Sequence, residues 1–368
     1  MKFNCSQKDF LNGLQIVNRA IGLNNTLQIL NNILIEIKDK KLYLTATNLE
    51  IVISFWCDVD IKNEGSITIP AKIISNYINL LPDEKLEIST EEGFIFNLKS
   101  KTIKTKIKGL NPQDFPLLPN IEKEDSFQIN SQDLLQNLNQ TIFAVMVNNT
   151  RPALTGIYFN LKDGVLKIVA TDGYRLAEKI TKIPNKNSQI IDFILPYKTA
   201  LDLQNILSKY KKEEVEIIIS KNQISFNIKN IKLTSKLIKG VFPDYQQIIP
   251  KEINTKVILN TQEFTMSIKR IDIFARENNN SVSIKIVKGG KVFVSTETTQ
   301  IGEGHEEIEA QIEGENNQIN LNSTYLLNVL ENINSDEIVL EINSKLKPAL
   351  IKPYKKDDYT YLLMPLKI

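Results

Sequence analysis

Hydrophobic and polar positions form one pattern that occurs three times along the chain. Each copy starts with alternating apolar residues, continues with a Ser/Thr-Gln-charged triplet and ends in an amphipathic run. The copies are KFNCSQKDFLNGLQIV from Lys2, FQINSQDLLQNLNQTI from Phe127 and VILNTQEFTMSIKRIDIF from Val257. Apolar residues recur at helical spacing in each run. Each copy is therefore predicted to hold a helix that buries one face and exposes the other.

The first residue of each triplet is suited to cap its helix. Ser6, Ser131 and Thr261 each carry a side-chain oxygen that can accept a free backbone N–H of the first helical turn. They lie 125 and 130 residues apart. We predict that they are the three N-caps.

Two further features keep nearly the same period. Alternating apolar residues predict a strand in each copy. These strands are LYLTATNLE from Leu42, LKIVATDGY from Leu166 and VFVSTETTQ from Val292. A second helix is predicted after Pro70, Pro196 and Asn322, which are spaced by 126 residues. The chain is therefore expected to be a triplication.

Pro-rich segments close the first two copies. GLNPQDFPLLP from Gly109 and GVFPDYQQIIP from Gly240 are rich in turn-forming residues and indicate domain boundaries near 121 and 251. At 368 residues the chain also exceeds one ordinary core. We predict three α+β domains, residues 1–121, 122–251 and 252–368, each with two helices on a strand-rich sheet.

Composition limits the class of protein. The content is 42% hydrophobic and 24% charged, as in globular proteins. The chain has no long apolar stretch and no signal-like start, so we expect a cytosolic protein without a membrane segment. With a net charge of +2, nucleic-acid binding would depend on how the lysines are arranged. Cys5 and Cys57 are expected to be buried free thiols.

Residues for catalysis are scarce. The single histidine, His305, stands in the acidic stretch EGHEE and has no second histidine to complete a common metal site, so we expect it to be solvated. Neither glycine-rich phosphate loop, GxGxxG nor GxxxxGK[ST], occurs. Asp172 precedes Gly173 and is expected to stabilise a turn. We predict no catalytic residue, metal or cofactor.

Three classes of function fit these residues. A triplication can be a protein-interaction scaffold, or it can support an enzyme such as a nuclease that uses Asp, Glu and a metal. It can also be half of a ring. Two chains joined head to tail would give six similar units, with twelve helices facing the same side.

Four segments resemble a known family. They are TRPALTGIYF at 150–159, ATDGYRLA at 170–177, FPDY at 242–245 and the terminal LLMPLKI. In this order, the chain resembles the bacterial DNA polymerase III beta subunit, the sliding clamp, over its whole length. The resemblance implies a DNA clamp fold in which helices line a central hole and antiparallel sheets lie outside. It also implies a head-to-tail homodimer without catalytic activity that makes polymerases processive.

The resemblance implies weak contacts with double-stranded DNA that do not depend on base sequence. The matching positions are Asn24, Lys72, Asn148, Arg151 and Lys198. Asn24 departs from the family, which commonly has a basic residue there. The alternative is that the lysines are ordinary solvated charges.

A peptide-binding groove between the middle and C-terminal domains is also implied. In the family it receives short peptides of DNA polymerases, the clamp loader and repair proteins. The matching positions are Leu154, Thr171, Gly173, Tyr174, Arg175, Leu176, Pro243, Gln247, Ile248, Pro348, Leu350, Leu362, Met364, Pro365 and Leu366. Tyr174 stands where many relatives have His, and Gln247 replaces a frequent Arg. Without the resemblance, LLMPL would be interpreted as a buried last strand.

The resemblance finally implies a subunit contact between the first domain of one chain and the third of the other. Ile107, Ile273 and Phe274 match its apolar centre. Opposite charges could surround it, with Lys104, Lys106 and Lys108 facing Glu303, Glu306, Glu307 and Glu309. The alternative is that the lysines protect a solvated edge strand from aggregation.

Overall fold

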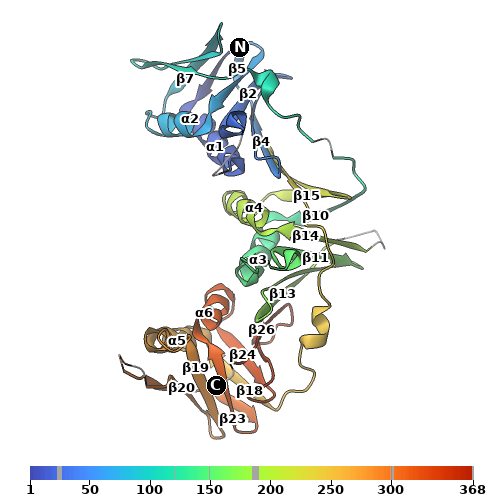
Figure 1. The fold of residues 1–368 in the computed structure, drawn as a ribbon, viewed down its shortest axis with the longest axis vertical. Helices are drawn as coiled ribbons and strands as arrows, with labels where there is room; N and C mark the ends of the chain where they lie inside the picture. The colour runs from blue at the N-terminus through green and yellow to red at the C-terminus, as the bar shows by residue number, and fades with distance from the viewer. Residues whose placement is uncertain are drawn as a thin grey trace. The chain divides into compact units, whose positions relative to one another are not determined.

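The computed structural model describes residues 1–22, 27–119, 121–148, 150–184, 190–298, 300 and 302–366. Two helices and eight strands recur in the same order in each of three copies (Figure 1). The triplication, the α+β class and both helices predicted in each copy are confirmed.

The first copy contains β1 (Lys2–Ser6), α1 (Gln7–Val17), β2 (Asn32–Lys38), β3 (Lys41–Thr47), β4 (Ile51–Cys57), β6 (Gly65–Pro70), α2 (Ala71–Asn79), β7 (Lys85–Glu91), β8 (Ile95–Lys99) and β9 (Lys104–Lys108). It also has the additional strand β5 (Asp60–Asn63).

The second copy contains β10 (Asp125–Asn130), α3 (Ser131–Thr141), β11 (Gly156–Lys162), β12 (Val165–Thr171), β13 (Arg175–Lys182), β14 (Ile191–Pro196), α4 (Tyr197–Lys209), β15 (Glu214–Ser220), β16 (Gln223–Ile228) and β17 (Ile231–Lys236).

The third copy contains β18 (Thr255–Asn260), α5 (Thr261–Ala275), β19 (Ser281–Val287), β20 (Lys291–Ser295), β21 (His305–Glu309), β23 (Asn317–Asn322), α6 (Ser323–Asn332), β24 (Glu337–Ile342), β25 (Ala349–Pro353) and β26 (Tyr359–Leu363). Its additional strand is β22 (Gln311–Gly314).

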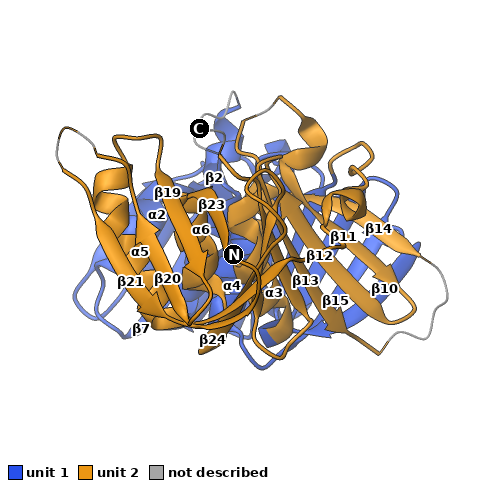
Figure 2. Ribbon diagram, turned by 90° about the horizontal axis from the view of Figure 1, so that it is seen from below, with its two compact units in different colours: residues 1–132, 201–237 blue, residues 133–200, 238–368 orange. Residues whose placement is uncertain are grey.

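The strands form four antiparallel sheets in two compact units (Figure 2). Residues 1–132 and 201–237 hold the sheets β5-β1-β7-β8-β9 and β10-β15-β16-β17-β4-β3-β2-β6. Residues 133–200 and 238–368 hold the sheets β14-β11-β12-β13-β26-β25-β24-β18-β22 and β21-β20-β19-β23.

Each of the two long sheets spans two copies. In the first, β17 of the second copy pairs with β4 of the first, with Leu233 opposite Ile53. In the second, β13 pairs with β26 of the third copy, with Leu176 opposite Leu362. We call these pairs the first and second junctions. The compact units therefore divide the middle copy, whereas the predicted domain ranges follow the sequence repeat.

The helix starts differ from the prediction at two of three positions. Ser6 caps α1 and accepts a 3.0 Å hydrogen bond from the Asp9 N–H, as predicted. Thr261, however, is already inside α5, and the cap is Asn260, which accepts from the Glu263 N–H at 2.9 Å. In α3 the Asn130 amide oxygen accepts from the Gln132 N–H at 2.8 Å, while the Ser131 hydroxyl accepts from Glu213.

The helix starts differ because of the residue that precedes each predicted cap. Asn130 and Asn260 each have a short side chain with a strong acceptor, so the helix begins one residue earlier. The first copy has Cys5 there, and a thiol is a weak acceptor.

The cysteines are both free, and only Cys5 is fully buried. The prediction that Cys57 is buried is therefore wrong in degree, because it is half-buried at the end of β4. Burial, followed by nearby carboxylates, raises the pKa of the Cys57 thiol to about 12. Among the described residues, no helix is long and apolar enough to cross a membrane.

Candidate functional site

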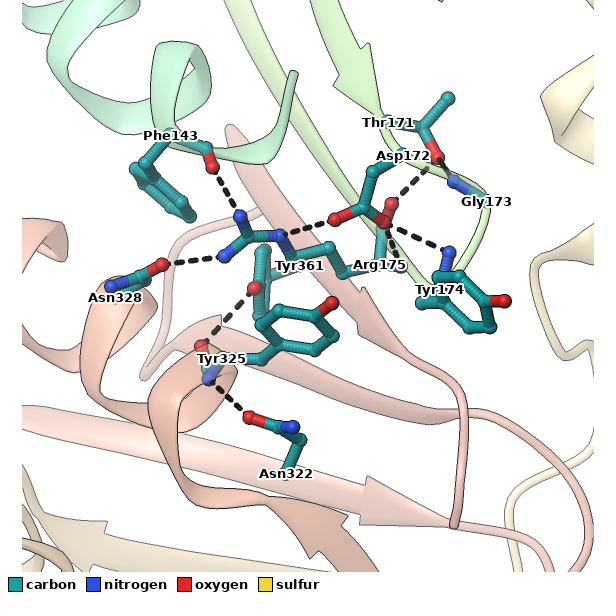
Figure 3. A network of polar contacts seen from close by, with 10 residues as sticks. All are labelled: Phe143, Thr171, Asp172, Gly173, Tyr174, Arg175, Asn322, Tyr325, Asn328 and Tyr361. Carbon is teal, nitrogen blue, oxygen red and sulfur yellow. Dashed lines mark hydrogen bonds and ion pairs between the residues drawn. The ribbon is translucent and has the colours of Figure 1, made fainter. Parts of the chain in front are cut away.

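The turn between β12 and β13 is held by its own side chains (Figure 3). The Asp172 carboxylate accepts hydrogen bonds from the N–H groups of Tyr174 and Arg175 at 2.9 and 3.0 Å. The Thr171 hydroxyl donates to the Arg175 carbonyl at 2.6 Å and accepts from the Gly173 N–H at 3.1 Å. Gly173 has φ +90°, which glycine adopts without strain. The predicted turn role of Asp172 is confirmed.

Arg175 links this turn to two other elements (Figure 3). Its guanidinium donates to Asp172 at 2.9 Å, to Asn328 of α6 at 2.5 Å and to the Phe143 carbonyl at 2.5 Å. It also lies 4.3 Å from the centre of the Tyr325 ring. The side chain is only 10% exposed. Arg175 therefore fixes the turn against α6, and each of its three guanidinium nitrogens donates a hydrogen bond.

The same cluster influences one titrating group. Burial raises the pKa of Tyr325; the Asp172 carboxylate adds to this effect, and the Arg175 guanidinium opposes it. Tyr325 is therefore a neutral hydroxyl under ordinary conditions, and its ring lies against a fixed cation.

The C-terminal segment runs beside this turn. Leu362 and Leu363 end β26 and are buried, as expected of a last strand. The Met364 N–H then donates to the Tyr174 carbonyl at 2.9 Å, and the Met364 side chain is 39% exposed. The Leu366 N–H donates to the Asn320 carbonyl at 2.8 Å. The buried last strand is therefore confirmed for Leu362 and Leu363, while Met364 is exposed and its role in a groove stays a prediction.

A buried cluster lies beneath these exposed residues. Four predicted groove residues belong to it and are at most 3% exposed: Leu154, Leu176, Leu350 and Leu362. The cluster also contains Val169, Ile194, Phe242 and Tyr245, and the Phe242 ring stacks on Tyr158 at 4.8 Å. Sequence reasoning missed these aromatic residues, although FPDY was itself a quoted motif. Burial raises the pKa of Tyr245, as does Glu178, which accepts its hydroxyl hydrogen bond.

The other predicted groove residues divide between buried and exposed positions. Thr171 is buried and belongs to the turn, and Pro348, Pro365 and Leu366 are half-buried. The exposed residues are Gly173, Tyr174, Pro243, Gln247, Ile248 and Met364. The Gln247 amide donates to Asp244 at 2.8 Å. Exposed apolar side chains thus lie along segments whose buried residues form one core cluster.

A cavity of about 600 Å³ lies next to the turn. Its walls include Gly173, Tyr174 and Arg175, which were predicted to bind peptides, and Asn148 and Arg151, which were predicted to contact DNA. Sequence reasoning assigned these two sets to different surfaces. The fold brings them to one cavity.

The remaining predicted residues lie elsewhere. Lys72 is exposed on α2 and Lys198 on α4, and Asn24 lies outside the described residues. Ile107 is buried on β9, Ile273 is 58% exposed on α5, and Phe274 beside it is half-buried.

The single histidine and the acidic residues near it lie on and around β21. His305 is exposed, 4.0 Å from Glu303. Over the part of the chain that the structure describes, no three His, Cys, Asp or Glu side chains gather as a metal site would require. Glu306 pairs with Arg270 at 2.5 Å and Glu307 with Lys291 at 2.6 Å.

Comparison with known families covers almost the whole chain. Residues 1–119, 128–244 and 246–367 match the N-terminal, central and C-terminal domains of the DNA polymerase III beta subunit. The chain belongs to the DNA polymerase III beta subunit family. The three matches follow the three copies, so the fold is the three-domain sliding clamp fold.

Relatives in this family align with this chain over its full length. The beta sliding clamps of Staphylococcus epidermidis and Staphylococcus aureus are 32% and 31% identical over 377 aligned residues, covering 100% of this chain and 99% of the relative. The Bacillus subtilis DNA polymerase sliding clamp superposes with a TM-score of 0.96 at 30% identity, covering 100% of this chain and 99% of that one. A Pseudomonas aeruginosa sliding clamp bound to griselimycin has a TM-score of 0.96 at 27% identity and covers 100% of both chains. This beta subunit therefore functions as a DNA polymerase sliding clamp, a processivity factor.

Proposed function

We propose that two copies of this chain join head to tail into a ring around duplex DNA, through strands β9 and β21. The supporting observation is the order of the strands. Each copy contributes two sets of four neighbouring strands. At both junctions the last strand of one set pairs with the last strand of a set from the next copy, β4 with β17 and β13 with β26. Strands β9 and β21 hold the corresponding positions in their sets and are sheet edges within the described chain.

The residues of these two edges are complementary. Lys104, Lys106 and Lys108 are exposed on β9, and Ile107 is buried. On β21, Glu307 and Glu309 are exposed and Ile308 is buried. An antiparallel pair would align one apolar face and bring lysines opposite glutamates, which favours correct pairing.

Charge reversal tests this proposal. Lys104→Glu/Lys106→Glu and Glu307→Lys/Glu309→Lys should each prevent dimerisation alone, because like charges would face each other at both contacts. Mixed in equal amounts, the two variants should form dimers and be retained on circular DNA until it is linearised. Lys62→Glu, on the opposite edge strand β5, is the control and should remain dimeric. Monomers in the mixture, measured by sedimentation velocity, would contradict the pairing.

We further propose that the exposed apolar residues above the buried cluster receive short peptides of polymerases, the clamp loader and repair proteins. Tyr174 and Met364 are exposed at the rigid turn. Ile248 is exposed next to Ile249, which packs against the core cluster. Burying a few apolar anchors there would give modest, exchangeable affinity.

Fluorescence anisotropy measures this binding. The probe is a fluorescein-labelled peptide that carries a glutamine, a leucine and a phenylalanine. Met364→Asp should weaken binding at least about tenfold, because it removes a contact of roughly 1.5–3 kcal/mol. Met266→Asp replaces a similarly exposed methionine on α5 and should have no effect. Equal affinities for both variants would exclude this groove.

We propose that contacts with DNA are few, weak and salt-dependent, and that the chain has no catalytic activity. Lys72 and Lys198 are exposed on helices, and Arg151 is exposed at the cavity. A ring holds DNA by topology, so a net charge of +2 is sufficient. Such a ring works on chromosomal DNA, so we propose a cytoplasmic location. DNA cleavage by the purified protein with Mg²⁺ would contradict the absence of activity.

A further inference from the structure

The turn at the first junction has the same hydrogen bonds as the turn in Figure 3. The Thr47 hydroxyl donates to the Ile51 carbonyl at 2.9 Å and accepts from the Leu49 N–H at 3.0 Å. The Asn48 amide oxygen accepts from the N–H groups of Glu50 and Ile51 at 3.0 and 2.8 Å. Each bond has its counterpart 124 residues later, in Thr171 to Arg175.

The strand pairing that follows this turn also has its counterpart at the second junction. Thr234 lies opposite Val52, as Leu362 lies opposite Leu176. The Lys236 N–H donates to the Glu50 carbonyl at 3.0 Å, as the Met364 N–H donates to Tyr174 at 2.9 Å. The first junction therefore reproduces the backbone that carries the proposed peptide groove.

A hollow of about 150 Å³ lies on this backbone. Its walls include Thr47, Leu49 and Val52 from the junction, together with Pro116, Leu117, Leu118 and Pro119. Leu117 is 99% exposed, Leu49 47% and Leu118 40%. Phe115 and Pro116 precede the two leucines, and the same Phe-Pro pair begins FPDY at Phe242. Both phenylalanines are buried. The hollow thus has exposed apolar side chains on one part of its wall and polar residues on the rest, among them Gln223 and Thr234, and it is open to solvent.

Leu49 is held in an unusual backbone conformation. Its φ is +74°, at the position where the second junction has Gly173. A leucine in this region is strained, and such strain is concentrated at functional sites. The turn nevertheless presents the Leu49 side chain to the hollow.

Charge distinguishes this hollow from the groove at the second junction. Glu50 and Lys236 stand where the other groove has Tyr174 and Met364, and they form a 3.0 Å ion pair. Both side chains are more than half exposed, so water and salt screen the pair and it can open for a ligand.

We infer that the first junction is a second, weaker peptide groove, which takes an extended segment with one leucine or phenylalanine anchor flanked by charged residues. A cavity of about 150 Å³ holds one benzene-sized group, so it suits a single anchor. A basic residue of the peptide would pair with Glu50 and an acidic one with Lys236. Because it has fewer anchors, this groove should bind about 10- to 100-fold more weakly than the other. The inference rests on the proposed function for its class of ligand.

Calorimetric titration with the same peptide, extended by a lysine and a glutamate around the phenylalanine, separates the two grooves. Wild-type protein should bind two peptides per chain, in a tight and a weak class. Leu49→Asn should abolish the weak class alone, since asparagine tolerates positive φ and removes the apolar side chain. Leu117→Asp should act in the same way. Met364→Asp should weaken the tight class at least about tenfold and leave the weak class unchanged.

A control variant and a crosslinking readout distinguish the possible outcomes. Leu80→Asp changes another highly exposed leucine and should leave both classes intact. A benzophenone in place of the phenylalanine ring should crosslink to residues 116–119 in Met364→Asp protein. A weak class that persists in Leu49→Asn, or that is absent from the wild type, would overturn the second groove. A smaller sedimenting species for Leu117→Asp would assign the hollow to a contact between copies. A wild-type protein that shows the weak class without the tight class would count only against the proposed function.

Discussion

The two junctions share one backbone and differ in their side chains. At the second junction the turn holds Asp172, Gly173, Tyr174 and Arg175, and at the first it holds Asn48, Leu49, Glu50 and Ile51. Corresponding strands pair in the same antiparallel register in both, β4 with β17 and β13 with β26. The buried end of the turn, however, is an ion network in one junction and an aliphatic contact in the other, where Ile51 is 3% exposed.

This comparison teaches that backbone pairing joins the copies, while a few side chains decide what each junction does. Main-chain hydrogen bonds are available to any sequence with strand propensity, so the repeated frame survives many changes. The side chains of the turn carry the differences in charge, strain and exposure. Substitutions exchanged between the junctions therefore test the comparison directly.

The largest effect is expected from Arg175→Met. It leaves Asp172 without its cation and the Phe143 carbonyl without its donor, in a site where the Arg175 side chain is 10% exposed. Breaking a buried ion pair on one side costs about 3–5 kcal/mol of unfolding free energy. Ile51→Val at the first junction should cost about 1 kcal/mol. Urea denaturation measures both, and a smaller loss for Arg175→Met than for Ile51→Val would refute the difference.

Asp172→Asn is expected to follow. Asn48 demonstrates that an amide oxygen can hold this turn, so the backbone should be kept. The charged hydrogen bond to Arg175 is lost, which costs about 2 kcal/mol. The reciprocal Asn48→Asp has Ile51 where the second junction has Arg175, and it should change stability by less than about 0.5 kcal/mol. Thermal unfolding compares the pair; similar effects would show that the Arg175 contact contributes little.

Gly173→Leu places a leucine at positive φ in the second junction, as Leu49 is in the first. No atom lies within 4 Å of the added Cβ, so the cost is conformational and should be about 1 kcal/mol. Leu49→Gly should have a smaller effect, because relief of strain is offset by greater freedom of the unfolded chain. Denaturation midpoints test this order. A neutral Gly173→Leu would mean that positive φ is not costly here.

The smallest effect is expected from Lys236→Gln. The ion pair with Glu50 is exposed, and such pairs contribute at most about 0.5–1 kcal/mol. The substitution should leave the denaturation midpoint almost unchanged in both low and high salt. A loss that disappears at high salt would show that the pair stabilises the junction instead of lining a site.

Much of the fold could be predicted because its signals are local. Alternation gave β3, β12 and β20, and helical spacing gave α1, α3 and α5, since each pattern depends on neighbours within a few residues. The turn role of Asp172 was predictable for the same reason. The caps Asn130 and Asn260 were also local signals, which a stronger weight on asparagine before Ser131 and Thr261 would have found.

The partners of Arg175 could not be predicted in this way. Phe143 and Asn328 are 32 and 153 residues distant in sequence and meet Arg175 only when β13 lies beside β26 and α6. The same holds for the cavity, where Asn148 and Arg151 join Gly173 and Tyr174. Neither pairing leaves a periodic trace in the chain.

The sequence by itself determined the three copies, their helices and strands and the turns between them, because short-range patterning selects local structure. The tertiary structure alone decided that the sheets continue from copy to copy, that β9 and β21 are left as edges and that two turns 124 residues apart form the same frame. Strand pairing joins residues far apart in the chain, and only the packed fold selects among the edges that could pair.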